Sequence, residues 1–316
     1  MYFVWKGMLS KMSFNYTIYG LNVESDLEIP EAYKQTDRCQ NDVCVVIGDI
    51  PQDIQKIITD GNIEGNFMYK GSDFFIFRVA DVADYLVYPS KIYIRLFDNA
   101  NENDVKVFLL GTGFGLCMIL RNNIAIHGGA VCRNNTGIIV TGESGCGKST
   151  ITNNLLMNGW KFIADDVCSI TIKENGAHIN MAYPQLKLCR DAAINMGYDL
   201  ESLIYIDEDR DKFAVRLKEG YLPEGADFSK LFEITLTEAD SVSYTRLEGL
   251  QKLQILTRNI FRKEVTFDKW KMPPEYLKQC LNLIQHIEVY SIKRPKDKDT
   301  VEDILNIISS ECKCNI

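Results

Sequence analysis

Short apolar runs separated by polar turns fill the first third of this 316-residue chain. The runs are rich in aromatic and β-branched side chains, which suit strands better than helices. Clusters of turn-forming residues such as Lys70–Asp73 separate them. The pattern predicts strands at Tyr16–Val23, Val43–Ile47, Asn66–Tyr69, Phe74–Val79 and Ile92–Phe97. No catalytic cluster occurs here, so we expect this β-rich part to cover or position a catalytic domain, or to bind an extended peptide at a sheet edge.

A polar stretch at Asn99–Asp104 interrupts this pattern. We therefore predict a β-rich N-terminal region at residues 1–103 and an α/β domain at residues 104–316. The second domain opens with an apolar segment, Asp104–Leu120, that predicts a long buried helix. Its three glycines, Gly111, Gly113 and Gly115, do not have the spacing of a dinucleotide-binding loop and no strand leads into them, so we expect them to permit close packing of the helix.

The stretch Thr136–Asp166 predicts the order strand, loop, helix, strand. Ile138–Val140 is a β-branched run of the kind found in buried strands. The helix that begins at Lys148 ends at Asn158–Gly159, a sequence typical of a helix C-terminus. A second strand, Trp160–Ala164, follows directly, so the loop before the helix lies between two strands of one predicted sheet.

That loop matches the phosphate-binding pattern G-x-x-x-x-G-K-[ST] without gaps: Gly142-Glu143-Ser144-Gly145-Cys146-Gly147-Lys148-Ser149. Its glycines let successive N–H groups converge on phosphate oxygens. The first turn of the helix, which includes Thr150, adds unpaired donors and a partial positive charge. Lys148 can neutralise the β- and γ-phosphates, and the Ser149 hydroxyl can bind Mg²⁺. Cys146 is interpreted as a small residue at a tolerant position rather than a redox-sensitive thiol.

Two acidic residues, Asp165 and Asp166, follow the second strand and should face the same pocket. Adjacent carboxylates repel each other, and a divalent cation relieves that repulsion. Neighbours on a strand point to opposite faces, so these two can share one task only if the strand ends before them. One of them could instead cap the next turn.

A histidine, His127, lies in the predicted strand Asn123–Val131, which ends in a turn at Asn134–Asn135. A single histidine in a strand is often structural. Its place just before the phosphate loop makes a functional role equally reasonable, because titratable groups with perturbed pKa values gather at sites.

Beyond the acid pair the apolar spacing predicts further elements: a short helix at Asp191–Met196, a strand at Phe213–Leu217, and helices at Gly249–Arg262 and Tyr276–Ile287. Between the first two, Asp207–Lys212 is charged and predicts a solvated loop.

The net charge is −8, from 43 acidic and 35 basic residues, which argues against nonspecific binding to nucleic acid or to an anionic membrane. The longest apolar run, Val107–Leu120, has 14 residues, fewer than the roughly 20 needed to cross a bilayer. Residues 1–12 contain too short an apolar segment for a signal peptide. Ten cysteines without that signal indicate free thiols, and three histidines argue against a structural metal site. We therefore expect a cytoplasmic protein.

Three runs resemble the catalytic domain of HPr kinase/phosphorylase, whose fold is shared with the phosphoenolpyruvate carboxykinases: IHGGAV, TGESGCGKST and GWKFIADDV. The wider chain is more similar to HPr-kinase-related proteins encoded beside peptide natural-product genes, including the lasso-peptide kinases. That wider similarity lies in five segments: Tyr19–Leu21, Leu27–Pro30, Phe108–Gly111, Tyr183–Leu188 and Val289–Pro295.

The resemblance implies a role for each matching residue. Gly142–Thr150 would hold the phosphates of ATP, with Lys148 on the transferred group and Ser149 on Mg²⁺. Asp165 matches the family's general base, Asp166 would help to hold the metal or the base, and His127 matches a histidine close to that aspartate. Lys212 and Arg216 are similar to a basic position near the family's site.

One region departs from HPr kinases. Their Glu-containing signature after the acid pair serves phosphorolysis and docking of HPr, and Ile179–Arg190 does not align with it. The resemblance therefore does not extend to phosphorylase activity, to HPr as substrate or to a hexamer, and a homo-oligomer is left open.

The sequence thus favours an ATP- and Mg²⁺-dependent kinase that phosphorylates a Ser or Thr hydroxyl, most simply in a ribosomally made peptide precursor. Two alternatives stay open: a kinase for a small metabolite such as free serine, and a nucleotide-binding peptide-recognition protein without transfer.

Overall fold

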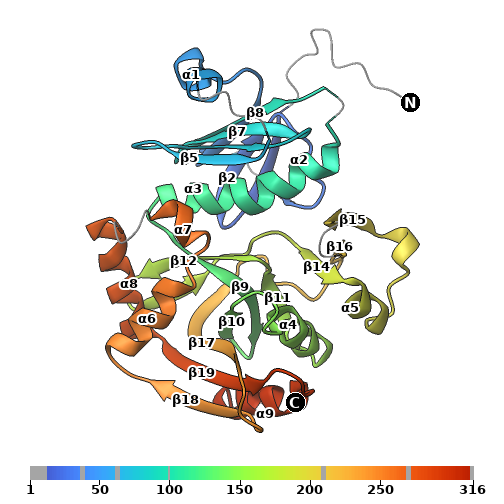
Figure 1. The fold of residues 1–316 in the computed structure, drawn as a ribbon, viewed down its shortest axis with the longest axis vertical. Helices are drawn as coiled ribbons and strands as arrows, with labels where there is room; N and C mark the ends of the chain where they lie inside the picture. Colours follow the sequence, from blue (N-terminus) through green and yellow to red (C-terminus); the bar gives the residue numbers. More distant parts are fainter. Residues whose placement is uncertain are drawn as a thin grey trace.

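The computed structural model describes residues 13–35, 40–60, 65–98, 100–207, 211–267 and 272–313. Residues 1–12, whose apolar segment is too short for a signal peptide, lie outside this part, as do Asn99 of the predicted polar break and residues 208–210 of the predicted charged loop. The described residues form three β-sheets with helices between and around them (Figure 1).

The N-terminal sheet has eight strands within the described residues, in the order β3-β1-β2-β4-β8-β7-β6-β5. The strands are β1 (Phe14–Ile18), β2 (Leu21–Ser25), β3 (Tyr33–Lys34), β4 (Val43–Ile47), β5 (Phe67–Lys70), β6 (Phe75–Val79), β7 (Ala83–Val87) and β8 (Lys91–Leu96). A helix, α1 (Gln52–Asp60), follows β4, and its Ile54 and Ile58 pack against Ile76 and Leu86 of the sheet. The prediction of a β-rich region therefore agrees with the structure, although α1 was not foreseen.

Two differences from the predicted strands have clear causes. The single strand predicted at Tyr16–Val23 is wrong, because the chain reverses at Tyr19 and Gly20, whose φ values are 54° and 75°. Two left-handed residues in succession form a tight hairpin turn. Strand β7 was missed because it contains a charged residue, Asp84, which is fully buried between Arg78 and Arg95.

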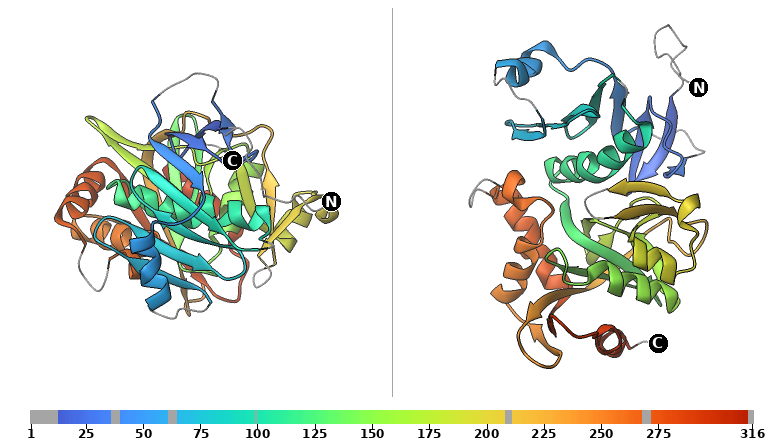
Figure 2. Two further views of the ribbon diagram at one scale, coloured as in Figure 1. Left: turned by 90° about the horizontal axis from the view of Figure 1, so that it is seen from above. Right: turned by 45° about the vertical axis from the view of Figure 1, so that its right-hand side comes forward.

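A continuous helical segment follows the N-terminal sheet and confirms the helix predicted at Asp104–Leu120. It consists of α2 (Glu102–Phe108), the π-helical turn η1 (Leu109–Gly113) and α3 (Phe114–Leu120). Among the described residues it is the one helix long and apolar enough to cross a membrane, but most of it is buried between the two large sheets (Figures 1 and 2). A Cβ atom at Gly115 would lie 2.6 Å from the Phe261 ring, so this glycine does permit close packing.

The second large sheet has the order β10-β9-β12-β13-β17-β19-β18, with β11 also paired to β9. The strands are β9 (Ile124–Arg133), β10 (Thr136–Gly142), β11 (Lys161–Ala164), β12 (Val167–Lys173), β13 (Gly176–Ile179), β17 (Ala226–Thr237), β18 (Ser243–Leu247) and β19 (Glu288–Pro295). The predicted turn between β9 and β10 is confirmed: Asn134 and Asn135 have φ values of 50° and 61°. Because β17 pairs with β13 at its start and with β10 farther along, the sheet folds back on itself.

A small third sheet, in the order β14-β16-β15, stands beside the second one. Its strands are β14 (Gln185–Cys189), β15 (Ile204–Asp207) and β16 (Lys212–Arg216), and the strand predicted at Phe213–Leu217 corresponds to β16. The short helices α5 (Arg190–Asn195) and η2 (Leu200–Ser202) connect its strands. The predicted helix at Asp191–Met196 is therefore confirmed as α5.

The helices α4 (Lys148–Met157), α6 (Leu250–Arg258), α8 (Pro274–His286) and α9 (Val301–Glu311) cover the second sheet. The short helix α7 (Lys263–Thr266) instead contacts β5 of the N-terminal sheet, where Lys70 donates to the Thr266 carbonyl. The helices α6 and α8 confirm two predictions, although α6 ends four residues earlier than the predicted Arg262. The reason is that Phe261 donates its N–H to the carbonyl of Ala125 in β9, and Ile260 bridges Ile126. The chain from 259 to 261 thus leaves the helix to pair with a strand.

Candidate active site

The phosphate loop is held in shape by close contacts that exclude side chains. It joins β10 to α4, and Ile138–Val140 of β10 are completely buried. Gly142 has a φ of 140°, and a Cβ atom there would lie 2.2 Å from the Ile234 carbonyl oxygen of β17. Gly147 has a φ of 102°, and its Cβ atom would lie 2.9 Å from the guanidinium of Arg294. The sequence therefore needs glycine at both positions to turn the chain into the helix.

A cavity of about 330 Å³ lies over this loop and the start of α4. It is lined by the loop, by β9 and by the acid pair, together with β14 and β16: His127, Gly128, Gly129, Ser144, Gly145, Gly147, Lys148, Ser149, Thr150, Asp165, Asp166, Lys187, Cys189 and Lys212. We call it the phosphate cavity. Backbone donors and three lysines beside one helix N-terminus suit it to bind an anion.

Three of the predicted loop residues do not line the phosphate cavity. Gly142 and Glu143 instead accept hydrogen bonds at their carbonyl oxygens from Lys148 Nζ, both at 2.9 Å. Burial lowers the pKa of Lys148. The third, Cys146, is buried beside Gly142, and burial raises the pKa of its thiol, so the thiol is not poised as a reactive thiolate.

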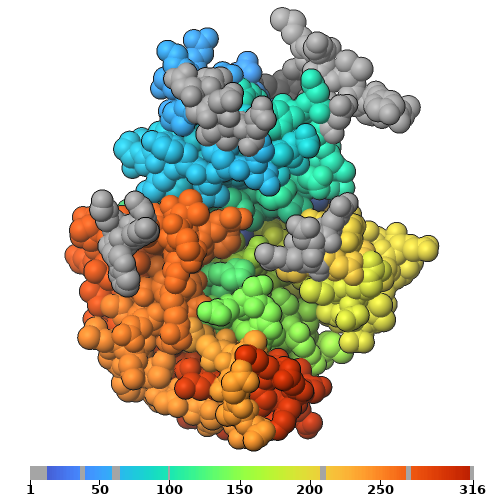
Figure 3. Space-filling model, in the orientation of Figure 1, coloured from blue at the N-terminus to red at the C-terminus, as the bar shows by residue number. Residues whose placement is uncertain are grey.

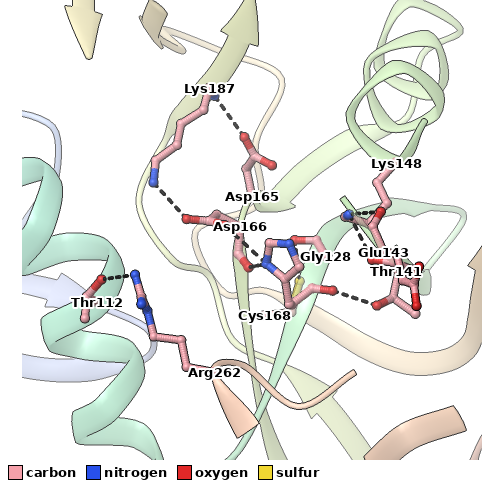
Figure 4. A network of polar contacts seen from close by, with 12 residues as sticks. Thr112, Gly128, Thr141, Glu143, Lys148, Asp165, Asp166, Cys168, Lys187 and Arg262 are labelled. Atoms are coloured by element: carbon pink, nitrogen blue, oxygen red, sulfur yellow. Dashed lines mark hydrogen bonds and ion pairs between the residues drawn. The ribbon is translucent and has the colours of Figure 1, made fainter. Parts of the chain in front are cut away.

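The acid pair lies in a bend after β11. The strand ends at Ala164, and Asp166 has a left-handed φ of 72°, so the two carboxylates are not alternate side chains of a strand. The strand therefore ends before the two acids, which is the condition under which both can act on one substrate. Asp165 Oδ2 accepts the backbone N–H of Lys187 at 2.9 Å, and Asp166 Oδ2 accepts from the ammonium of the same lysine, also at 2.9 Å (Figure 4).

His127 lies directly beside the acid pair. Its Nδ1 is 3.0 Å from the carbonyl oxygen of Asp166 and 3.3 Å from Asp166 Oδ1. A carbonyl oxygen can only accept a hydrogen bond, so Nδ1 carries the hydrogen. His127 pairs with Val167 across β9 and β12, which fixes the ring against the bend. The structure thus brings together the predicted histidine, both acids and the phosphate loop.

The two acids have opposite electrostatic surroundings. Burial, and then the neighbouring Asp166, raise the pKa of Asp165. Burial would also raise the pKa of Asp166, but Lys187 and His127 outweigh it and hold this pKa well below its usual value. Burial would lower the pKa of Lys187, but the ion pair with Asp166 raises it. The Asp166–Lys187 pair is therefore ionised around neutral pH, while Asp165 holds a proton more readily.

A larger groove, of about 1040 Å³, opens on the other side of Asp166. Figure 3 shows its position in the central hollow between the N-terminal sheet, the α6–α7 region and the third sheet. Its walls come from all three: Asn66, Val107, Phe108, Gly111, Thr112, His127, Gly142, Glu143, Ser144, Asp166, Lys187, Ile206, Arg258, Asn259, Ile260, Phe261, Arg262, Lys263 and Glu264. Four residues line both the groove and the phosphate cavity: His127, Ser144, Asp166 and Lys187.

The sequence does not indicate Lys187 as a site residue, and only one of the two basic residues that it does indicate on β16 lines the phosphate cavity. Lys187 stood within the family-like segment Tyr183–Leu188, but nothing in its local sequence distinguishes it from a surface lysine. Of the two candidate basic positions on β16, Lys212 lines the phosphate cavity, whereas Arg216 is exposed and lines neither space. Arg294 also went unnoticed, although its guanidinium donates to the Cys146 carbonyl in the loop at 3.5 Å.

The residues around the phosphate cavity fit a magnesium ion. The Ser149 hydroxyl and the Asp166 carboxylate supply hard oxygen ligands to one space. No group of three or more His, Cys, Asp or Glu side chains that could hold a metal occurs within the described ranges. Mg²⁺ usually takes one or two protein oxygens and completes its shell with water and nucleotide phosphates.

Comparisons with known proteins point to one domain. Residues 119–187 match the family model described as the HPr Serine kinase C-terminal domain. The matched segment contains His127, the phosphate loop and both acids, and it ends at Lys187. This part of the chain is therefore HPr-kinase-like, within a mixed α/β fold.

The other comparisons add less. A search of curated protein sequences found no match. Among solved structures, the fold was aligned with the Hpr(Ser) kinase/phosphatase from Coxiella burnetii at 12% sequence identity and a TM-score of 0.32. That alignment covers 60% of this chain and 90% of the other.

Proposed function

We propose that this protein is an ATP- and Mg²⁺-dependent kinase that transfers the γ-phosphoryl group to a serine or threonine hydroxyl. One observation carries the proposal: the phosphate cavity and the groove meet at His127, Asp166 and Lys187. A triphosphate held by the loop would place its terminal group at this junction, and an acceptor hydroxyl would reach it from the groove. Phosphoryl transfer needs this in-line placement more than it needs covalent chemistry.

The roles of the acids follow the family resemblance. Asp165 is the proposed general base, which accepts the proton of the acceptor hydroxyl as the new P–O bond forms. Asp166 and Ser149 would hold Mg²⁺, which supplies neutralisation of the charge on the β- and γ-phosphates. The opposite directions of the two pKa values agree with this division, since a base needs some affinity for a proton and a metal ligand must stay ionised.

Lysines and the histidine complete the proposed site. Lys148 and Lys187 would stabilise the negative charge of the transferred group, because both line the phosphate cavity. His127 orients Asp166 through the contacts at 3.0 and 3.3 Å described above.

The size of the groove favours a peptide as acceptor. At about 1040 Å³ it lies at the upper end of the roughly 300–1000 Å³ of pockets for drug-sized ligands, and free serine would fill only a small part of it. The N-terminal region contributes Asn66 to its wall, which supports a role of that region in peptide recognition. A ribosomally made peptide precursor is the acceptor we propose, in line with the resemblance to kinases of peptide natural products.

Transfer from γ-labelled ATP tests this proposal. The full chain, with Mg²⁺, is offered either a serine-containing precursor peptide or free serine, and the product is separated by size. Label on the peptide supports the proposal, and label on serine alone would replace the acceptor with a small metabolite. If ATP binds but no label moves to either acceptor, the protein is a nucleotide-dependent recognition protein and the kinase proposal fails.

A further inference from the structure

The π-helical turn η1 reaches the ion pair of the candidate site. A Cβ atom at Gly111, in the middle of this turn, would lie 3.5 Å from Lys187 Nζ and 3.8 Å from Asp166 Oδ2. The next residue, Thr112, accepts a hydrogen bond from Arg262 at 3.1 Å (Figure 4). Such turns occur often at functional sites, because they widen a helix locally and shift its side chains. Here the turn brings backbone against the Asp166–Lys187 pair.

Tyr19, a residue of the N-terminal region, is hydrogen-bonded to this turn. The hydroxyl of Tyr19 donates to the carbonyl oxygen of Leu110 at 3.0 Å, and its backbone N–H donates to the carbonyl of Ala182 at 3.2 Å. The ring contacts Phe114 of α3 and Tyr183, with centroids 6.1 and 6.2 Å away. Leu110 precedes Gly111, and Ala182 and Tyr183 lead into the strand that carries Lys187. Tyr19 therefore ties together the two segments that set the position of the ion pair.

The backbone of Tyr19 is held in an uncommon conformation. Its φ of 54° is left-handed, which non-glycine residues adopt rarely and at a steric cost. A Cβ atom on the following Gly20, whose φ is 75°, would lie 3.0 Å from Asn180 Oδ1, a tight contact. Tyr19 is also 1% exposed, so its hydroxyl is committed to the turn and not to water. Strained residues of this kind gather where the surrounding structure needs a fixed geometry.

We propose that Tyr19, at the tip of the β1–β2 hairpin, is a positioning residue of the active site. By fixing the π-helical turn and the start of the segment 182–187, it keeps Lys187 Nζ on Asp166 and so keeps both groups at the junction of the two cavities. This inference rests on the proposed kinase function for its catalytic consequence. It gives the N-terminal sheet a part in catalysis in addition to any part in recognition.

The first test compares two tyrosine hydroxyls that donate hydrogen bonds to the same helical segment. Tyr19→Phe removes the bond to Leu110, and Tyr85→Phe removes an equally buried bond of the same length, 3.0 Å, to Val105 in α2. We expect Tyr19→Phe to lower kcat about tenfold with the Kd for ATP within twofold of wild type. Both variants should lower the melting temperature by a similar amount, because each loses one buried hydrogen bond. Tyr85→Phe should leave kcat unchanged. Equal kcat values for the two variants would overturn the proposal.

A second readout does not depend on activity. Acetic anhydride acylates exposed lysines faster than lysines held in buried ion pairs, and mass spectrometry reports the rate at each site. We expect the acylation rate of Lys187 to rise at least threefold in Tyr19→Phe and to stay unchanged in Tyr85→Phe. If wild type transfers no phosphate, the kinase proposal fails while this measurement still decides whether Tyr19 positions Lys187. An unchanged rate in Tyr19→Phe would remove the positioning role.

A third variant perturbs the contact itself and leaves the Tyr19 bond in place. Gly111→Ala puts a methyl group at van der Waals distance from Lys187 and Asp166, whereas the methyl of Gly113→Ala would contact only Leu109 and Phe108 of the same helix. We expect kcat to fall several-fold for Gly111→Ala alone. The same loss in Gly113→Ala would show a general effect on the helix and would count against the proposal.

Discussion

The phosphate cavity and the groove share Asp166 and Lys187, but the chain builds them in different ways. Most residues that line the cavity come from β9, the loop, the start of α4 and the acid pair, which follow one another in sequence, and only Lys187, Cys189 and Lys212 come from β14 and β16. The groove also borders the phosphate loop, but it takes most of its other walls from Asn66, from α2 and η1, from Ile206 and from residues 258–264. The difference suggests that the chemistry is encoded locally, whereas the choice of acceptor depends on how distant segments pack.

The largest expected effect concerns the base in the phosphate cavity. Asp165→Asn keeps the size of the side chain and its acceptor for the Lys187 N–H but removes the proton acceptor. We expect kcat to fall about 10³-fold, because general bases typically contribute 10²- to 10⁴-fold. ATP binding, measured by calorimetry, should be nearly unchanged.

The neighbouring acid provides the comparison for that prediction. Asp166→Asn should weaken the activation of the enzyme by Mg²⁺, whereas Asp165→Asn should keep its Mg²⁺ dependence. If Asp165→Asn turned over near-normally and Asp166→Asn were inactive, Asp166 would be the general base and Asp165 the Mg²⁺ ligand.

A second variant tests the residue that joins the two spaces. Lys187→Met removes the ammonium 2.9 Å from Asp166 Oδ2 but keeps an unbranched side chain. We expect kcat to fall about 10²-fold, as for the loss of one preorganised donor at a transition state. Lys230→Met is the control, because Lys230 pairs with Glu288 outside both spaces. A similar loss of kcat in the control would contradict a specific role of Lys187.

The same variant has a pH signature in stability. The pKa of Asp166 is depressed in the folded protein, so its pairing stabilises the fold above the unfolded pKa of about 4 and loses this effect as pH falls through the folded pKa. The raised pKa of Lys187 sets the upper pH limit, because the contribution of its ammonium group to the free energy of unfolding is complete below about pH 10. Chemical denaturation should therefore show Lys187→Met destabilised by about 2 kcal/mol between these limits. The deficit should shrink in acid.

The phosphate loop, the β9–β10 hairpin and α4 could be predicted because each of them leaves a local signal in the sequence. The glycine spacing specifies the loop, Asn134–Asn135 specifies the hairpin, and Asn158–Gly159 ends α4. The left-handed bend at Asp166 could be stated only as a condition, since an aspartate pair has no turn signature of its own. These features depend on neighbours within a few residues, which a sequence displays directly.

The rest of the site could not be predicted, for physical reasons. Lys187 reaches Asp166 through the pairing of β14 in a third sheet, and a lone lysine in a strand carries no sign of such a partner. The sequence pattern predicts one strand where the β1–β2 hairpin lies, because a tyrosine rarely adopts the left-handed φ that Tyr19 has and therefore gives no turn signal. Both contacts join segments far apart in the chain, and their energy comes from packing that a periodic pattern does not describe.

A third prediction separates nucleotide binding from transfer. Lys148→Ala removes the ammonium group from the phosphate cavity, and we expect the Kd for ATP to rise about 30-fold, or about 2 kcal/mol. The binding of adenosine, which has no phosphate, should not change. An unchanged Kd for ATP would mean that the triphosphate does not bind in the phosphate cavity. The conclusion that the chemistry is encoded locally would then fail.

The smallest expected effect concerns the groove alone, and it tests whether distant segments select the acceptor. Glu264 is exposed on α7 and lines the groove, so Glu264→Trp should fill part of the groove without disturbing the core. We expect the KM for a peptide acceptor to rise about tenfold, or about 1.4 kcal/mol, with the Kd for ATP unchanged.

Glu275→Trp, an equal change at an exposed position on α8 outside the groove, is the matched control and should leave both constants unaltered. Transfer to free serine, if any occurs, should be the same in both variants, because serine reaches the acid pair without contacting α7. If the KM for the peptide were unchanged in Glu264→Trp, the acceptor would not lie along α7. The groove would then have no role in selecting the acceptor.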